Sequence, residues 1–245
     1  MSLKSFLIIL FASNILFFPH MSVYATANAL DGGSKLYITF DDCYTNWSLI
    51  ASRYKDCQFT FFLSGELLPY RVNIIKQLLD NNHSIQNHSI SHKNLVRIAK
   101  SKRETFLQQD ILKHNILLGE LGVASPSIFA FPYGESDKDW NKRLLAHFKK
   151  LRGVGTFLNF PHYYKQEEFE KTSLLKSAKL YNYRFPFEFC FKFYINKMIK
   201  KMASGSFVVV LTTHQVGNTK YGITLSRLDY IVKVAKKNNV ALVGL

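Results

Sequence analysis

The sequence predicts an α/β protein in which parallel strands, arranged as a sheet or a closed barrel, are wrapped by helices. Strand-like runs of β-branched and aromatic residues alternate with helix-length segments through most of the chain, as in repeated strand–helix–strand units. The chain has 245 residues, of which 47% are hydrophobic and 15% aromatic. This composition supplies one large core and excludes a chain that is disordered as a whole.

The first half of the chain alternates apolar runs with amphipathic segments. The stretch 36–42 joins an apolar run directly to two carboxylates, as expected where a buried strand leaves the core. Apolar residues recur at helical spacing in 72–79, and the amphipathic segment 101–121 closes at Gly122. We expect strands at 36–42, 58–63, 84–87 and 127–131, and helices at 44–56, 72–79 and 101–121.

The second half keeps this alternation except in one segment. Pro132 and Gly134 end the strand 127–131 abruptly, and the run 206–213 is the clearest strand in the chain. We expect helices at 140–150, 188–202 and 225–237, and strands at 153–157, 206–213 and 240–243. The segment 158–186 is rich in Tyr, Phe, His and Lys, and we expect an irregular surface insertion there that could face a substrate.

Residues 1–29 are predicted to be a secretory signal peptide. Lys4 precedes an apolar run over residues 6–18, and the small residues that follow offer cleavage after Ala25, Ala27 or Ala29. The apolar run is short for a membrane span, so an uncleaved anchor is the lesser alternative. We therefore expect a secreted, periplasmic or cell-envelope protein whose folded domain is 30–245, with no stable membrane span in the mature form.

The chain is strongly basic. Lys and Arg total 32 against 17 Asp and Glu, a formal net charge of +15. Such a charge favours an anionic partner, which could be nucleic acid, a phosphate-bearing envelope polymer or acidic lipid. The lysines are dispersed, without zinc-finger spacing or a basic stripe interleaved with aromatic residues, so nucleic acid is not expected. The oligomeric state is not indicated.

The three cysteines are not expected to form a disulfide between Cys43 and Cys57. If 36–42 and 58–63 are consecutive parallel strands, these two residues lie at opposite ends of the sheet. That separation is roughly 15 to 20 Å, far beyond what a disulfide permits. Cys43 follows the two aspartates, where it could be a soft neighbour of a metal or a filler in a tight turn.

Polar side chains follow four of the predicted strands. They are Asp41 and Asp42, His88 and His92, Tyr133 between Pro132 and Gly134, and His214. The carboxyl ends of parallel strands are where α/β folds build their sites. Because successive side chains of a strand point in opposite directions, Asp41 and Asp42 cannot play the same part unless the backbone bends.

The two histidines have the spacing of a metal site. His88 and His92 are four residues apart, which on a helical turn lets both imidazoles reach one ion. A carboxylate from another strand would complete a facial set of three ligands with open positions for water and substrate. The alternative is a pair of loop or cap histidines bonded to the backbone, which Ser89 and Ser91 would suit. An isolated Asp-Asp pair could likewise be a solvated loop start.

These residues resemble a known set of motifs. Thr39-Phe-Asp-Asp42, His88-Ser-Ile-Ser-His92, Phe131-Pro-Tyr-Gly134 and Leu211-Thr-Thr-His214 are similar to the ordered motifs of the polysaccharide deacetylase family, also called NodB homology or carbohydrate esterase family 4. The resemblance covers residues 35–245. It implies a distorted (β/α) barrel with fewer than eight strands and a divalent metal ion, usually zinc.

The resemblance also assigns roles. It implies that Asp41 is the catalytic base and that Asp42, His88 and His92 hold the metal. His214 would be the general acid that protonates the leaving amine, and the backbone N–H of Tyr133 would help to hold the oxyanion. The products would be acetate and a free amine on the sugar.

The sequence departs from the family pattern beside the base. The third motif often has an arginine two residues before its proline, which orients the base aspartate, and here that residue is Ala130. Either another cation, such as Arg71 or Arg152, takes its place, or the base is less well tuned.

Other departures concern the acid histidine. A fourth motif, an Asp and a Trp that orient this histidine, is not evident: the segment Asp137–Trp140 has the letters but follows the third motif too closely. Gln215 follows His214 where an aspartate is common. Cys43 replaces a glycine after the aspartate pair. The metal triad itself is complete.

The function expected from the resemblance is removal of N-acetyl groups from N-acetylhexosamine units of a glycan. Peptidoglycan, chito-oligosaccharide and poly-N-acetylglucosamine are the candidate substrates, and the basic surface would suit an anionic envelope polymer. Aromatic residues could stack on sugar rings, with Trp47, Tyr163, Tyr164 and Tyr181 as candidates. The alternatives are a non-catalytic glycan-binding descendant of the fold, a hydrolase of another small amide, or a basic structural protein of the envelope.

Overall fold

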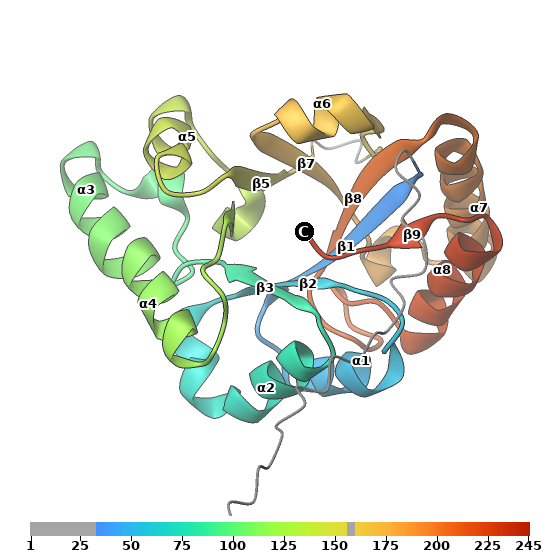
Figure 1. Cartoon of the computed structure of the whole chain (residues 1–245), viewed down its shortest axis with the longest axis horizontal. Coiled ribbons are helices and arrows are strands. Elements are labelled where there is room, and N and C mark those ends of the chain that lie inside the picture. Colours follow the sequence, from blue (N-terminus) through green and yellow to red (C-terminus); the bar gives the residue numbers. More distant parts are fainter. Residues whose placement is uncertain (1–32, 156–159) are drawn as a thin grey trace, which may run out of the picture.

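A closed barrel of seven parallel strands forms the centre of the molecule (Figure 1). The computed structural model describes residues 33–155 and 160–245. The barrel strands are β1 (Lys35–Asp42), β2 (Thr60–Leu63), β3 (Ser84–Asn87), β4 (Ile128–Ala130), β5 (Lys150–Val154), β7 (Leu174–Lys179) and β8 (Phe207–Thr213). The barrel closes because β1 pairs in parallel with both β2 and β8. This confirms a distorted (β/α) barrel with fewer than eight strands.

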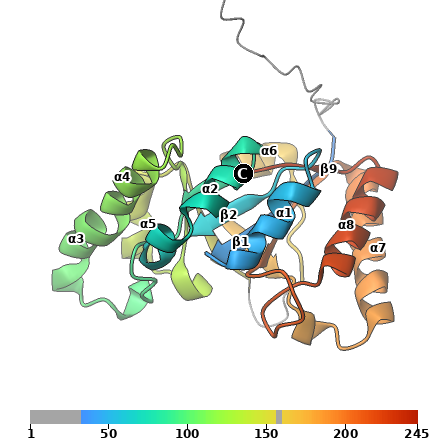
Figure 2. The same cartoon turned by 90° about the horizontal axis from the view of Figure 1, so that it is seen from below.

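Helices cover the outside of the barrel. They are α1 (Ser48–Arg53), α2 (Val72–Asp80), α3 (Arg103–Phe106), α4 (Lys113–Glu120), α5 (Lys138–Leu145), α6 (Gln166–Lys171), α7 (Glu188–Gly205) and α8 (Leu225–Lys237). A π-helical segment, Leu107–Leu112, joins α3 to α4. Figures 1 and 2 show α3 and α4 at one side of the molecule and α7 and α8 at the opposite side.

Two short strands extend the sheet beyond the barrel. β6 (Tyr164–Lys165) runs antiparallel to β8, and β9 (Ala241–Leu242) runs parallel to β1. Along β1 the side chains alternate between two environments. The ring of Phe40 packs outside the strands against Trp47, Phe59 and Phe61, whereas the next residue, Asp41, contacts side chains of other barrel strands.

The strand β5 begins three residues earlier than expected. The predicted strand 153–157 is instead Lys150–Val154, and α5 ends at Leu145 rather than near residue 150. A lysine can begin this strand because the Lys150 ammonium donates to the carbonyls of Phe169, Glu170 and Thr172. The shift places Arg152 in the middle of a barrel strand.

The segment 158–186 is not an irregular insertion in its described part, residues 160–186. It contains β6, α6 and β7, and β7 is a barrel strand that pairs in parallel with β5 and β8. The sequence of β7, LLKSAK, does not indicate a strand, because lysines interrupt the apolar residues and β-branched residues are absent. Leu175, Ser177 and Ala178 are nevertheless buried.

All three cysteines are free, and Cys43 and Cys57 are buried. Cys43 packs in the main hydrophobic core with 0% exposure, and burial raises the pKa of its thiol to about 12. The predicted signal peptide lies outside the described residues. Within the described ranges, no helix combines the length and the apolar character that a bilayer crossing requires.

Candidate active site

The barrel brings the predicted site residues together at the carboxyl ends of its strands. Asp42 ends β1, and its Oδ1 lies 3.1 Å from His92 Nε2 and 3.7 Å from His88 Nε2. Its Oδ2 lies 3.9 Å from Nε2 of His214, which follows β8. Three loops of the barrel therefore meet at one carboxylate.

A backbone bend separates the roles of the two aspartates. Asp42 has a φ of 82°, in the left-handed region, so it does not continue the alternation of β1. Tyr44 Oη donates a hydrogen bond of 3.0 Å to Asp42 Oδ2. Burial opposes ionisation of Asp42, but the close approach of His92 and the positive charge that the neighbouring histidines carry in acid outweigh it and hold the pKa of this carboxyl well below its usual range. Asp42 is therefore a carboxylate at neutral pH.

The segment that carries the two histidines is a loop and not the expected helical turn. Ser89 has a φ of 64° and His92 a φ of 48°, and the main-chain N–H of His92 donates to Ser89 Oγ. These turns bring the two imidazole rings to a centroid separation of 4.9 Å. The spacing predicted the proximity correctly but attributed it to the wrong local structure.

The orientation of His88 is set by the backbone of the next strand. His88 is 1% exposed, and its Nδ1 lies 2.8 Å from the carbonyl oxygen of Ala130. An N–H at Nδ1 satisfies this carbonyl, so the lone pair of Nε2 faces Asp42. Burial lowers the pKa of His88 to about 4, which keeps the imidazole neutral at pH 7.

These three side chains fit a divalent cation. The candidate ligand atoms of Asp42, His88 and His92 all lie within 4.8 Å of one another. Asp42 Oδ1 is buried and makes no hydrogen bond of ordinary geometry with a described donor. One carboxylate and two imidazoles form the donor set that Zn²⁺ and similar metals accept, with positions left open for water or substrate.

The other aspartate of the pair, Asp41, forms an ion pair with an arginine. Asp41 and Arg152 are 3% and 0% exposed, and Arg152 Nη2 lies 2.5 Å from Asp41 Oδ1. Thr212 Oγ1 donates to the other carboxylate oxygen at 3.2 Å. The second candidate cation, Arg71, donates instead to the carbonyl of Tyr70. Arg152 is therefore the cation that holds Asp41.

His214 is held mainly through its backbone. Its carbonyl accepts a hydrogen bond of 2.7 Å from Trp47 Nε1, and its N–H donates to the carbonyl of Tyr221. The rings of Tyr181 and Tyr221 lie 5.3 and 6.1 Å from the imidazole. Its Nδ1 is buried and has no hydrogen-bond partner among the described residues.

A family model described as polysaccharide deacetylase matches residues 30–152, just over half of the chain. The chain belongs to the polysaccharide deacetylase family. A peptidoglycan-N-acetylglucosamine deacetylase from Bacillus cereus is 31% identical over 106 residues, which cover 42% of this chain and 37% of that protein. The alignment thus spans little more than a third of that relative.

Solved structures share the fold. A peptidoglycan N-acetylglucosamine deacetylase in complex with 4-naphthalen-1-yl-N-oxidanyl-benzamide has a TM-score of 0.60 and 19% identity, and the match covers 87% of this chain and 86% of that one. A family 4 carbohydrate esterase from Streptomyces lividans in complex with acetate has a TM-score of 0.56 and 14% identity, covering 86% and 92%. These matches extend the barrel likeness well beyond residue 152.

The arginine missing from the third motif of this deacetylase family member is supplied by the adjacent strand. Ala130 on β4 and Arg152 on β5 are direct register partners. The guanidinium thus reaches Asp41 from the neighbouring strand, and it also packs 4.8 Å from the ring centroid of Phe62.

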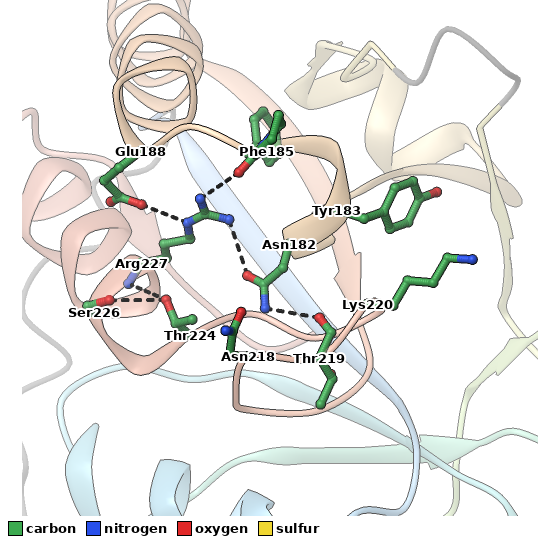
Figure 3. A pocket seen from close by; sticks show the side chains of 11 residues that line it. Asn182, Tyr183, Phe185, Glu188, Asn218, Thr219, Lys220, Thr224, Ser226 and Arg227 are labelled. Atoms are coloured by element: carbon green, nitrogen blue, oxygen red, sulfur yellow. Dashed lines mark hydrogen bonds and ion pairs between the residues drawn. The ribbon is translucent and has the colours of Figure 1, made fainter.

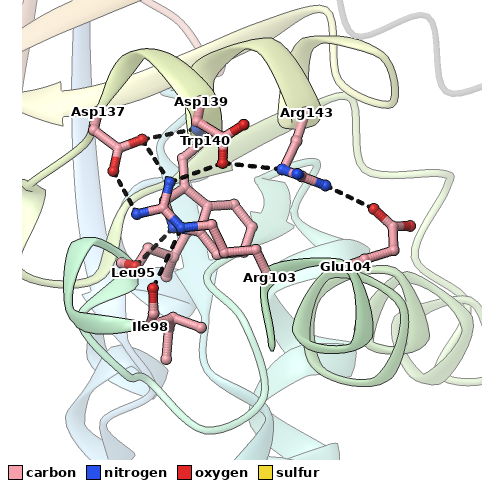
Figure 4. Close-up of polar contacts among 8 residues, drawn as sticks. All are labelled: Leu95, Ile98, Arg103, Glu104, Asp137, Asp139, Trp140 and Arg143. Carbon is pink, nitrogen blue, oxygen red and sulfur yellow. Dashed lines mark hydrogen bonds and ion pairs between the residues drawn. The ribbon is translucent and has the colours of Figure 1, made fainter. Parts of the chain in front are cut away.

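The Asp137–Trp140 segment has a structural role instead of orienting His214 (Figure 4). Asp137 caps α5 through the Trp140 N–H and forms an ion pair of 2.6 Å with Arg103. Trp140 is fully buried, and its Nε1 donates to the carbonyl of Leu95. Among the described residues, no Asp and Trp pair orients His214, in agreement with the unpartnered Nδ1 of this histidine.

The exposed aromatic rings at the site are not the ones expected from the sequence. Trp47, Tyr164 and Tyr181 are buried and Tyr163 is half-buried. Tyr133 is 66% exposed with its ring 5.0 Å from that of His92. Near His214 the exposed rings are Tyr183 and Tyr221, at 48% each. Tyr221 could have been noted from its position in the segment that follows His214.

A polar hollow lies beside Tyr183 (Figure 3). Its cavity volume is about 540 Å³, and Tyr183 and Lys220 line it together with backbone and side chains of the loop after β8. Arg227 braces the hollow through Glu188, Asn182 and the carbonyl of Phe185. The rings of Tyr183 and Tyr221 lie 6.0 Å apart, so they connect the hollow to His214.

Proposed function

We propose that this member of the family is a secreted, metal-dependent hydrolase that removes N-acetyl groups from N-acetylhexosamine units of a glycan. Family membership supports the class of reaction. One observation carries the proposal for this chain: Asp42, His88, His92 and His214 converge on one point at the barrel mouth, beside an Asp41 that is paired with Arg152.

Asp42, His88 and His92 would hold the metal ion. When bound, a divalent ion such as Zn²⁺ acts as a Lewis acid that polarises the amide carbonyl and makes water more acidic. The chain supports this role by keeping His88 neutral and correctly oriented through Ala130. Tyr44 orients the carboxylate of Asp42 in the same way.

The remaining residues would move protons and stabilise charge. Asp41, fixed by Arg152 and Thr212, accepts a proton from the water that attacks the acetamide carbonyl carbon. The N–H of Tyr133 donates to the oxyanion that develops at the carbonyl oxygen. His214 gives a proton to the sugar nitrogen as the C–N bond breaks. The products are acetate and the free amino sugar.

The surroundings of the site suit a glycan. Exposed rings of Tyr133, Tyr183 and Tyr221 flank the histidines on two sides, where sugar rings can stack. The hollow beside Tyr183 offers hydroxyl, amide and ammonium groups to a neighbouring sugar unit. Peptidoglycan is the first polymer to test, because the peptidoglycan-N-acetylglucosamine deacetylase from Bacillus cereus is 31% identical to this chain over the aligned segment.

The test is acetate release from peptidoglycan, an acetylated chito-oligosaccharide and poly-N-acetylglucosamine, with and without a chelator, alongside metal analysis of the purified chain. Chelator-sensitive acetate release supports the proposal. A chain that holds metal but releases no acetate from any glycan is a glycan-binding descendant or a hydrolase of another amide. Mass spectrometry of the exported chain shows whether cleavage occurs after Ala25, Ala27 or Ala29.

Two substitutions separate the roles of the site residues. We expect Asp41→Asn to keep the metal and to lose nearly all turnover, on the order of a hundredfold or more, because it removes the base but no ligand. We expect His88→Ala to lose both metal and turnover. Equal metal loss in the two variants would show that the roles are assigned wrongly.

A further inference from the structure

Three large apolar rings are exposed together at the start of α7. Phe187, Phe189 and Phe193 are 61%, 71% and 68% exposed, and the rings of Phe187 and Phe189 are stacked at 5.7 Å. The opposite face of α7 is anchored in the core through residues such as Phe191 and Ile195. The anchored face of α7 therefore keeps the three phenylalanines on the surface of the folded chain.

Lysines continue the same surface. Phe189, Phe193, Lys197 and Lys200 follow one another at spacings of four, four and three residues, which places them on one face of α7. Between α7 and α8 lies a groove with a cavity volume of about 740 Å³. Lys197, Lys200, Lys233 and Lys237 line this groove, together with Phe193 and Tyr230.

The positive charge of this surface is not neutralised within the described chain. The only carboxylates on α7 and α8 are Glu188 and Asp229, and these pair with Arg227 and Arg53. None of the four groove lysines forms an ion pair with a described carboxylate. The surface thus combines bare phenylalanine rings with unpaired ammonium groups.

We infer that this α7/α8 surface docks the protein onto a bilayer that contains anionic lipid. The side chain of phenylalanine has no polar atom, so moving its ring from water into the apolar edge of the headgroup layer lowers the free energy. Lysine stems are long enough to lie along that layer while their ammonium groups contact lipid phosphates. The chain is held at the membrane surface by this face, without a membrane-spanning helix among the described residues.

Two other occupants fit the surface less well. A second copy of the chain would cover the phenylalanines but would also bring two sets of groove lysines together, and like charges repel. A soluble polyanion would pair with the lysines but would leave all three rings in water. A bilayer with anionic headgroups satisfies both the exposed rings and the unpaired lysines of this surface.

The first test is co-sedimentation of the full chain with phosphatidylcholine vesicles, with and without phosphatidylglycerol. We expect binding that requires phosphatidylglycerol and falls as salt rises. Replacing Lys197, Lys200, Lys233 and Lys237 by Gln should weaken binding by about fivefold per lysine at low salt. Replacing the three phenylalanines by Ser should weaken it by on the order of tenfold per ring that inserts.

Matched controls lie on the opposite side of the molecule. Ile116 on α4 is 64% exposed, and Lys138 and Lys142 lie on α5. Ile116→Ser and the pair Lys138→Gln with Lys142→Gln should bind as the wild type does. All variants keep the same N-terminal residues, so a difference between them reports on the surface itself.

A local readout keeps the test independent of any other membrane contact. Both native tryptophans, Trp47 and Trp140, are fully buried. Phe193→Trp therefore adds one exposed indole, whose emission should shift to the blue and be quenched by brominated lipid when vesicles are added. Ile116→Trp is the control and should not respond.

Several results would overturn the inference. They are equal binding by the wild type and the substituted chains, an unresponsive indole at position 193, and binding to soluble polyphosphate but not to vesicles. Concentration-dependent dimers that the phenylalanine substitutions abolish would place a second copy on this surface instead.

Discussion

Asp41 and Arg152 form a buried ion pair. Both side chains are almost completely removed from water, so each charge depends on the other. From the sequence, Arg152 was one of two arginines that could replace the family arginine missing at position 130. Choosing between the two arginines required knowing where β5 begins. The predicted strand 153–157 leaves Arg152 outside the sheet, whereas the observed strand Lys150–Val154 makes Arg152 the register partner of Ala130.

We predict that Arg152→Met lowers the free energy of unfolding by about 3 to 5 kcal/mol, because it leaves the Asp41 carboxylate buried and unpaired. Adding Asp41→Asn should recover part of this loss, since it removes the orphaned charge. Urea unfolding of the wild type, both single variants and the double variant measures the coupling. Strictly additive effects would mean that the two side chains do not depend on each other.

At the scale of elements, the loop of the metal ligands is clamped by the π-helical segment. The carboxylate of Asp110, within Leu107–Leu112, accepts hydrogen bonds from the main-chain N–H groups of Ile90 and Ser91. These two residues lie between His88 and His92. A π-helical turn displaces the side chains of one helix turn relative to an α-helix, and such turns occur often at functional sites. Sequence periodicity indicated the helix but not this irregularity.

We predict that Asp110→Ala weakens metal affinity by about ten- to a hundredfold, because the loop between the two histidines loses its clamp. Competition with a fluorescent chelator measures the affinity. Glu120→Ala removes an exposed carboxylate from α4 and should leave the affinity unchanged. An Asp110→Ala chain with wild-type affinity would show that the loop holds its shape without the clamp.

The turn after β4 sets the position of the Tyr133 N–H. Tyr133 and Gly134 have φ values of 64° and 75°, and a Cβ added to Gly134 would lie 2.5 Å from Val154 Cγ2. We predict that Gly134→Ala destabilises the fold by about 1 to 3 kcal/mol and lowers kcat with little loss of metal, because the turn must move.

Gly119→Ala is the control for this substitution, because a Cβ there meets nothing within 4 Å and Gly119 lies in α4. It should stabilise the chain by about 0.5 to 1 kcal/mol. If the Gly134→Ala chain kept the wild-type kcat, the Tyr133 N–H would have no role in stabilising the oxyanion.

For the whole molecule, the order of strands and helices was largely predictable, because most barrel strands are short apolar runs that end in turn or polar residues. β7 was not, since lysines interrupt it and it is recognised only by its pairing with β5 and β8. Convergence of the site residues followed from the rule that the carboxyl ends of parallel strands meet. The positions of Tyr133 and Tyr221 next to the site motifs were visible in the sequence, but the exposure of their rings could not be predicted, because exposure depends on how the loops after β4 and β8 pack.

The pH dependence of stability also belongs to the whole molecule, because it reports on histidines buried throughout it. His83 lies between Phe59 and Phe61, and its Nδ1 accepts the Phe59 N–H. Burial lowers the pKa of His83 to about 4, and that of His114 to about 3. In the unfolded chain a histidine has a pKa of about 6.5.

Between pH 6.5 and 4 the unfolded chain therefore binds more protons than the folded chain, so stability is present above this window and is lost as the pH falls through it. His83→Asn keeps an acceptor for the Phe59 N–H but cannot titrate. It should reduce the slope of unfolding free energy against pH by up to about 1.4 kcal/mol per pH unit. Urea unfolding of the wild type and of His83→Asn at several pH values measures the two slopes, and a wild-type slope in His83→Asn would show that His83 takes up its proton without unfolding the barrel.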